Sequence, residues 1–370
     1  MKKEIRTIGA IALAAAMMMG MQTTAFAQES DDSAAVGTTA VITDVFTISD
    51  GDSAANLPAA TFEYSIAAGT GAAATATTPK ISDGIGTPTV NNAVHAATAS
   101  GVTEDRQDVE FDFSGVSFTE AGIYRYTVSQ TKGESNVSED IEADVDNNGA
   151  GSYFLDVYVQ KDNGNFTPFA YVLSKDGAIE NTAGEDGTTA NYANKVDTIT
   201  NEYTTYDLTV SKTIVGDMAA NSFAFQIELD GVPADVIFKQ DESDKAESEN
   251  YTLTADLGNE QSTVITGLPS TVSYQIQEAV NQLEGYKVEV VDSNEAAAEY
   301  SWIGDEGSAE AYGNSASVIG KQDVTVGFTN TLNNISPTGL VMRYAPYILI
   351  LAAGIVIAII ATRKKSRDDD

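Results

Sequence analysis

A lysine stands where residues 207–216, DLTVSKTIVG, predict a buried side chain. The side chains of a strand alternate between two faces, so one face of this strand carries Leu208, Val210, Lys212 and Ile214. Burying an ammonium group is costly unless it finds a partner or loses its charge. The position of Lys212 therefore predicts either a buried ion pair or a reactive amine.

Two further polar residues interrupt apolar faces in the same half of the chain. Glu278 follows Tyr274 and Ile276 on one face of VSYQIQEAV, and Asn330 follows Val326 and Phe328 on one face of VTVGFTNTL. With Lys212, they come from the first, a middle and the last predicted strand of this half. The shared pattern predicts that the three polar side chains meet in one buried cluster.

Such a cluster permits a specific reaction. An apolar pocket lowers the pKa of a lysine, which makes its amine a neutral nucleophile, and raises the pKa of a glutamate, which keeps it protonated. Glu278 would then polarise the side-chain carbonyl of Asn330 and shuttle protons while the Lys212 amine attacks and ammonia leaves. The product is an uncharged amide between Lys212 and Asn330. The alternative is a buried Lys–Glu ion pair beside an asparagine, without a bond.

The elements that must position these residues are short strands. Thr, Val, Tyr and Phe alternate in runs that Gly, Asn and Asp interrupt, which predicts an all-β protein of β-sandwiches. The two halves resemble diverged repeats: ATFEYSI corresponds to NSFAFQIEL, GIYRYTVSQ to TVSYQIQEA, and VDTITNEY to VTVGFTNTL. We therefore expect two tandem sandwiches, over residues 28–205 and 206–332. Residues 67–100, rich in Ala, Thr and Gly, are expected to form a surface loop that leaves His95 exposed.

Composition excludes several classes of function. The chain has 54 acidic and 20 basic residues, one histidine and no cysteine. Such an acidic surface repels nucleic acid, and disulfides are not available. A single histidine argues against an exported hydrolase, so we expect no enzymatic turnover, no cofactor and no metal cluster.

Asp144–Gly149 resembles the start of a calcium loop, but position 12 would be Leu155, and a plain Asn-Gly turn is favoured.

Both ends of the chain look like processing signals. Residues 1–27 combine a basic start, an apolar stretch and a small-x-small triplet, which predicts a secretory signal peptide. Residues 345–362 form an apolar run followed by a basic tail, which predicts a C-terminal transmembrane helix within the segment 333–370. The part between the two signals is expected to be exported.

The motifs LTVSKTIVG, YQIQEAVNQLEGYKV and VGFTNTL resemble those of the isopeptide-forming, immunoglobulin-like domains of Gram-positive pilins and surface adhesins. The resemblance spans roughly residues 36–332 and is strongest from residue 200 to 332. It implies an intramolecular bond between Lys212 and Asn330, made with the help of Glu278 and without any external enzyme.

The first half departs from this pattern. Asp44 takes the place of the lysine and Gln130 that of the glutamate, whereas the asparagine is kept as Asn201. These residues offer no amine, so we expect a hydrogen-bonded polar cluster in the first domain and no cross-link.

The C-terminal segment is similar to a cell-wall sorting signal. Its candidate motif is Ser336-Pro337-Thr338-Gly339, which is closest to a pilin-type variant with serine in place of valine. The resemblance implies that a sortase cleaves between Thr338 and Gly339 and passes the acyl group to an amine. A chance Pro-Thr-Gly in an ordinary single-pass protein is the alternative.

The acceptor amine belongs either to a lysine of the next subunit or to peptidoglycan. Lys195 is the preferred candidate because it lies shortly before Asn201, with Lys161 and Lys175 as competitors. We therefore expect a pilus or fimbria backbone subunit on the cell wall, whose partners are sortase and other pilin subunits and which touches the membrane only through its C-terminal span. A monomeric adhesin anchored to peptidoglycan is the alternative, and a host surface ligand is left open.

Overall fold

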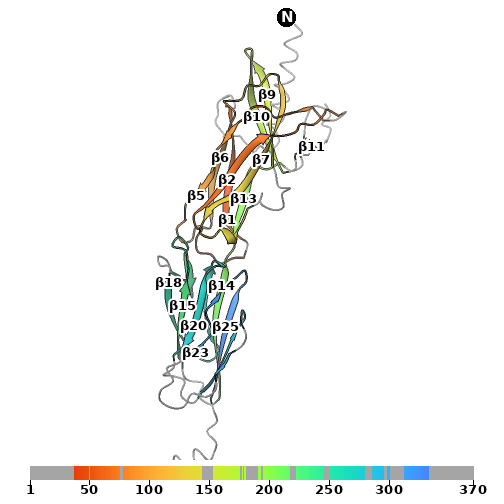
Figure 1. Ribbon diagram of the computed structural model, residues 1–370. Helices are drawn as coiled ribbons and strands as arrows, with labels where there is room; N and C mark the ends of the chain where they lie inside the picture. Colours follow the sequence, from red (N-terminus) through yellow and green to blue (C-terminus); the bar gives the residue numbers. More distant parts are fainter. Residues whose placement is uncertain are drawn as a thin grey trace, which may run out of the picture.

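The computed structural model describes residues 37–332, except for 50, 76–77, 144–152, 176, 178, 181–190, 193–194, 217–221, 246–249, 280–285, 296–297 and 301–311. Within these residues the chain is all-β, and its only helix is the 3-10 turn η1 (Ser138–Asp140). Two sheet-built domains lie end to end in an elongated molecule (Figure 1). The expected signal peptide, sorting motif, transmembrane span and calcium-like turn all lie outside the described residues.

The first domain contains two main sheets that enclose an apolar core. One sheet has the order β4 (Thr89–Val90), β6 (Glu104–Asp112), β1 (Thr39–Ile48), β13 (Thr198–Tyr203) and β8 (Ile141–Ala143). The other has the order β10 (Asn165–Ser174), β9 (Tyr153–Asp162), β7 (Gly122–Ser135), β2 (Ala60–Ala68) and β5 (Ala93–His95), with β3 (Ile81–Asp83) beside β7. A separate pair joins β11 (Ile179–Glu180) to β12 (Asn191–Tyr192).

The second domain has the same arrangement. Its larger sheet has the order β17 (Ser243–Lys245), β16 (Phe238–Gln240), β19 (Gln261–Leu268), β14 (Tyr206–Val215), β25 (Val324–Leu332), β21 (Tyr286–Asp292) and β22 (Ala298–Tyr300). Its smaller sheet has the order β18 (Asn250–Leu257), β15 (Phe223–Asp230), β20 (Ser273–Glu278) and β23 (Tyr312–Gly313), with β24 (Ser317–Val318) beside β20.

The strands that look repeated in the sequence are also paired alike. The first and last strands of each domain are parallel neighbours, β1 with β13 and β14 with β25. The corresponding inner pairs, β2 with β7 and β15 with β20, are both antiparallel. Because strand side chains alternate, this register fixes which residues of each domain face its core.

The expectation of a surface loop over residues 67–100 is wrong for its strands β3, β4 and β5. On β5, Ala93 and His95 face inward and only Val94 faces solvent. His95 pairs with Ala60 of β2 and is 1% exposed, so it is not an exposed bystander. The sequence does not reveal these strands because small residues such as Ala93 can fill a core position beside larger neighbours without giving a strong apolar signal.

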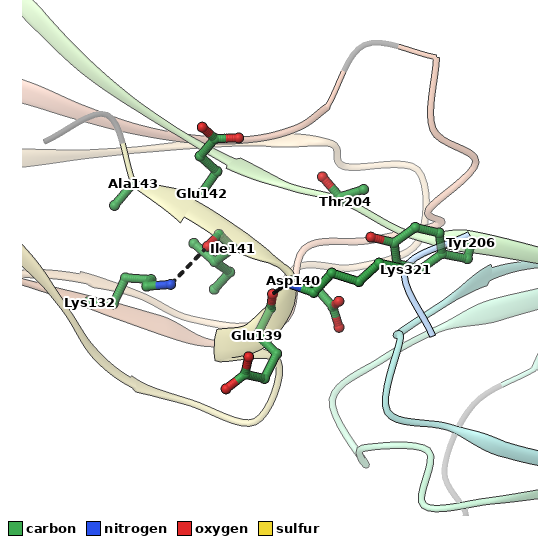
Figure 2. A pocket seen from close by; sticks show the side chains of 9 residues that line it. All are labelled: Lys132, Glu139, Asp140, Ile141, Glu142, Ala143, Thr204, Tyr206 and Lys321. Atoms are coloured by element: carbon green, nitrogen blue, oxygen red, sulfur yellow. Dashed lines mark hydrogen bonds between the residues drawn. The ribbon is translucent and has the colours of Figure 1, made fainter. Parts of the chain in front are cut away.

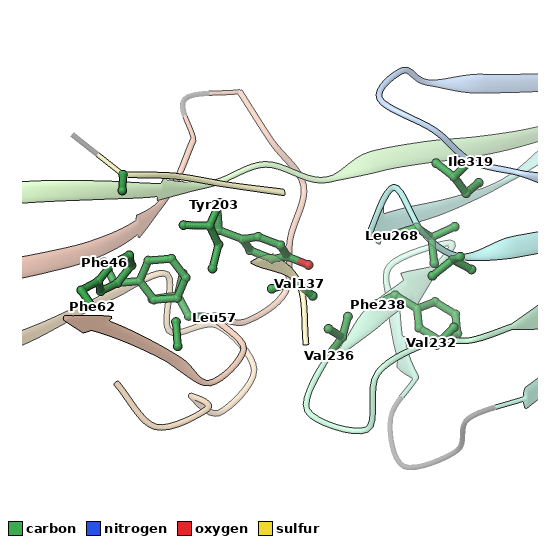
Figure 3. Close-up of a cluster of buried hydrophobic side chains, with 14 of the residues drawn as sticks. Phe46, Leu57, Phe62, Val137, Tyr203, Val232, Val236, Phe238, Leu268 and Ile319 are labelled. Carbon is green, nitrogen blue, oxygen red and sulfur yellow. The ribbon is translucent and has the colours of Figure 1, made fainter. Parts of the chain in front are cut away.

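Turns from both domains form the junction. The Asn56 amide donates from Nδ2 to the carbonyl of Asp235 at 2.9 Å, and its Oδ1 accepts from the Ile237 N–H at 2.8 Å. The Asp235 carboxylate accepts in return from the Ala59 N–H at 2.9 Å. Figure 3 shows apolar side chains of both domains, including Tyr203 and Val236, gathered at this junction.

A polar pocket lies on the same junction (Figure 2). Lys321 of the second domain donates to the carbonyl of Glu139 at 2.7 Å, and the Ser270 N–H donates to Asp140 at 3.0 Å. The two domains therefore meet through both apolar packing and hydrogen bonds.

Candidate functional site: a buried lysine–glutamate–asparagine cluster

The structure brings together the three polar residues of the second domain. Lys212 lies on β14, Asn330 on the parallel neighbour β25, and Glu278 on β20 of the facing sheet. Asn330 is paired with Ile214, two positions beyond Lys212, so the two side chains share one face. All three are buried, with exposures of 1% for Lys212 and Glu278 and 0% for Asn330.

One carboxylate oxygen of Glu278 contacts the side chains of both Lys212 and Asn330. Its Oε1 lies 2.6 Å from Nζ of Lys212 and accepts a hydrogen bond of 2.7 Å from Nδ2 of Asn330. The carboxyl group therefore contacts both the amine that would attack and the amide nitrogen that would leave. This differs from the expectation that Glu278 polarises the Asn330 carbonyl: within the described residues, Oδ1 of Asn330 has no hydrogen-bond partner.

Two aromatic rings that the sequence reasoning missed form the wall of the cluster. Nζ of Lys212 lies 4.6 Å from the ring centroid of Phe223 and 5.7 Å from that of Phe225. Both residues face inward from β15, and Phe225 is the direct partner of Glu278 in the sheet. Their alternation is visible in the sequence, but their position beside the lysine depends on strand pairing across the domain.

Burial brings the pKa values of Lys212 and Glu278 closer together. It lowers the pKa of Lys212 to about 8, against the opposing effect of the Glu278 charge. Burial also raises the pKa of Glu278, against the opposing effects of Lys212 and of the Asn330 hydrogen bond. Both shifts reduce the cost of passing a proton from the ammonium to the carboxylate, a transfer that leaves a neutral amine next to a neutral acid.

The corresponding residues of the first domain also meet. Asp44 on β1 accepts hydrogen bonds from Nε2 of Gln130 at 2.9 Å and from Nδ2 of Asn201 at 3.1 Å, and all three are buried. Asn201 is paired with Phe46, two positions beyond Asp44, which is the register that Asn330 has relative to Lys212. The cluster is thus equivalent in place, but it contains no amine that could form an amide.

The first-domain cluster has two members that the sequence reasoning did not assign to it. The hydroxyl of Tyr64, the strand partner of Gln130, donates to Asp44. Burial and the Asp44 charge raise the pKa of Tyr64, so its hydroxyl remains protonated. His95 contacts the other oxygen of Asp44 through Nε2, at 2.8 Å.

The three candidate acceptor lysines lie on the exposed surface of the first domain. Nζ of Lys161 lies 5.7 Å from the Phe166 ring, and Nζ of Lys175 lies 5.8 Å from the Tyr153 ring. Lys195 forms an isolated bridge with Ser174, and partial burial lowers the pKa of its amine. The choice of Lys195 as the acceptor stays a prediction.

No metal or membrane feature emerges from the described part of the chain. No group of three or more His, Asp or Glu side chains is arranged there to hold a metal ion. The same residues contain no helix with the length and apolar character needed to cross a bilayer.

Comparisons with known proteins agree with this architecture. The family described as "Domain of unknown function (DUF7601)" matches residues 206–332, the part that holds the Lys212 cluster. No curated protein matches the chain.

Among solved structures, the major pilin of Streptococcus pyogenes is similar, with a TM-score of 0.55 and 19% sequence identity over 80% of this chain and 99% of that one. The major pilin T3.2 from S. pyogenes serotype GAS13637 gives a TM-score of 0.52 and 20% identity over 81% of this chain and 100% of that one. The chain therefore has the two-domain fold of the streptococcal major pilins.

Proposed function

We propose that the protein is a structural cell-surface subunit of a pilus or fimbria, stabilised by an isopeptide bond that its second domain makes without an enzyme. The observation that carries the proposal is the buried Oε1 of Glu278, which contacts both Nζ of Lys212 and Nδ2 of Asn330. The pilin fold supports the assignment to a surface fibre.

The reaction follows from the contacts of Glu278. A proton moves from Nζ of Lys212 to Glu278, and the neutral amine attacks Cγ of Asn330. Glu278 then delivers this proton to the departing Nδ2 and takes up the second proton that Nζ must lose, so that one C–N bond forms, one breaks, ammonia leaves, and Glu278 ends protonated. The acid is not consumed, but each chain reacts only once, so the protein is not an enzyme with turnover.

The position of the bond gives it a mechanical role. Lys212 and Asn330 lie on the first and last strands of the second domain, which are parallel neighbours. Tension applied at the two ends of this domain would pass through the amide and would not peel the strands apart. The first domain, which has no amine in its cluster, would depend on non-covalent contacts alone.

Mass spectrometry of the purified protein tests the bond directly. We expect a mass below that of the processed sequence by about 17 Da, one ammonia, together with a cross-linked peptide that joins Lys212 and Asn330. The full sequence mass would refute the bond, and a loss of two ammonia molecules would show that the first domain is also cross-linked.

The proposal extends to assembly by sortase. The motif at residues 336–339 and the apolar segment after it would direct cleavage between Thr338 and Gly339, and Lys195 of the next subunit would accept the acyl group. The partners are then sortase and further pilin subunits, and the location is the cell wall, after a transient membrane stage.

Replacing Lys195 by alanine is expected to abolish the high-molecular-weight ladder of wall extracts on denaturing gels, because no acceptor amine remains. The matched variants Lys161→Ala and Lys175→Ala should keep the ladder. A ladder that persists in Lys195→Ala would exclude this acceptor. A single band from the unaltered protein would instead favour an adhesin anchored singly to peptidoglycan.

A further inference from the structure

His95 lies between two carboxylates inside the first domain. Its Nε2 is 2.8 Å from Oδ1 of Asp44, and its Nδ1 is 2.7 Å from Oδ2 of Asp105. The imidazole is buried, as is the side chain of Asp44, whereas the Asp105 side chain is 30% exposed. His95 is also the only histidine in the sequence.

The hydrogen bonds define the protonation that this arrangement requires. A carboxylate can only accept, so a ring nitrogen that bonds to one must carry a proton. Asp44 also accepts hydrogen bonds from three other side chains, those of Tyr64, Gln130 and Asn201. When both carboxyls are ionised, both ring nitrogens donate, which makes the ring an imidazolium ion.

Two aromatic rings also pack against the imidazole of His95. The rings of Phe46 and Phe62 each lie with their centroids 5.6 Å from that of His95. Asp105 also accepts from Nε2 of Gln107 at 2.9 Å. Burial opposes ionisation of Asp105, yet the hydrogen bonds from Gln107 and His95 and the charge on His95 lower its pKa overall. Among the described residues, the carboxyl groups that pair with His95 are those of Asp44 and Asp105.

These three residues also connect separate parts of the fold. Asp44 on β1 and Asp105 on β6 belong to the sheet that contains the last strand, β13, whereas His95 on β5 belongs to the facing sheet. Asp44 occupies the register position that Lys212 has in the second domain. The contact between the sheets is thus made at the place where the second domain has its reactive lysine.

We propose that Asp44, His95 and Asp105 form an ionic clasp, in which a buried imidazolium ion holds the two sheets of the first domain together at the position of the missing cross-link. The charge arrangement is reversed relative to the second domain: the first strand supplies the anion, and the cation comes from β5. This inference does not depend on the isopeptide bond of the second domain.

The single histidine allows a direct spectroscopic test on the unaltered protein. With ¹⁵N-labelled histidine at neutral pH, we expect the two ring nitrogens of His95 to resonate close together, as in a doubly protonated ring. Two widely separated nitrogen resonances, which mark a neutral tautomer, would overturn the proposal. Because it uses the unaltered protein, this measurement does not depend on whether the variants fold.

Hydrogen exchange tests the role of the clasp in stability. His95→Gln removes the cation and leaves Asp44 buried without it, so we expect amide exchange in β1 and β13 to accelerate by about 100-fold or more. Asp105→Asn keeps the size of that side chain and should cause a smaller acceleration. In both variants the amides of β14 and β25 should exchange as in the unaltered protein.

Val94→Gln is the matched control, because Val94 lies beside His95 on β5 but is 62% exposed. This variant should leave exchange in β1 and β13 unchanged. If His95→Gln exchanged no faster than Val94→Gln, the clasp would not stabilise the domain and the proposal would fail.

Discussion

Replacing Glu278 by alanine is expected to leave Lys212 and Asn330 unlinked, although both reactants remain in place. Oε1 of Glu278 contacts both nitrogens that exchange protons in the reaction. Without it, the ammonium has no acceptor and the departing amide nitrogen has no donor. The variant should retain the full mass of its sequence, about 17 Da above the value expected for a cross-linked chain, in intact-mass analysis.

Two further variants sharpen this experiment. Glu278→Gln keeps the shape of the side chain but cannot accept the ammonium proton as a carboxylate does, so it should also remain unlinked. Glu228→Ala removes an exposed carboxylate from the neighbouring strand β15 and should form the bond as usual. A Glu278→Ala chain that still lost one ammonia would show that burial of the lysine alone is sufficient.

The cluster was predictable because strand side chains alternate with a period of two. That rule alone places Lys212, Glu278 and Asn330 on apolar faces, and the structure finds all three buried and in contact through Glu278. The same rule placed Asp44, Gln130 and Asn201 together in the first domain. The all-β class and the repeated strand pairs followed from the same pattern.

The alternation of side chains along a strand does not predict which residues become neighbours across a sheet or between sheets. Phe225 could be assigned to an inward face, but its pairing with Glu278 depends on the register of β15 against β20. His95 was missed for another reason: its strand is three residues long and is embedded in small and polar residues. A short strand of that composition carries no periodic signal, and its histidine becomes buried only because charged partners on β1 and β6 compensate it.

The contacts at the domain junction could not be predicted from the sequence either. Asn56 and Asp235 lie in turns, where polar residues are usually solvated. Their hydrogen bonds across the junction exist only because two separately folded turns meet. The junction also joins a domain proposed to be cross-linked to one proposed to lack a cross-link, so that the two can differ in stability while remaining in contact.

That difference leads to the second large effect, the loss of stability in Asn330→Ala. The bond would close a loop of about 120 residues, and loop closure of this size contributes up to roughly 5 kcal/mol to the free energy of unfolding. We expect the unfolding midpoint of the second domain to fall by roughly 10 to 30 °C. Calorimetry of the full protein should show this transition moving toward that of the first domain.

Part of this loss comes from the cavity that the shortened side chain leaves and not from the missing bond. Glu278→Gln separates the two effects, because it prevents the bond while preserving the volume of the cluster, and it should retain most of the shift. Thr325→Ala, at an exposed position on β25, is the matched control and should melt like the unaltered protein. If Asn330→Ala and Glu278→Gln also melted like the unaltered protein, neither a covalent link between the first and last strands nor the ion pair of Lys212 and Glu278 would account for the stability of the second domain.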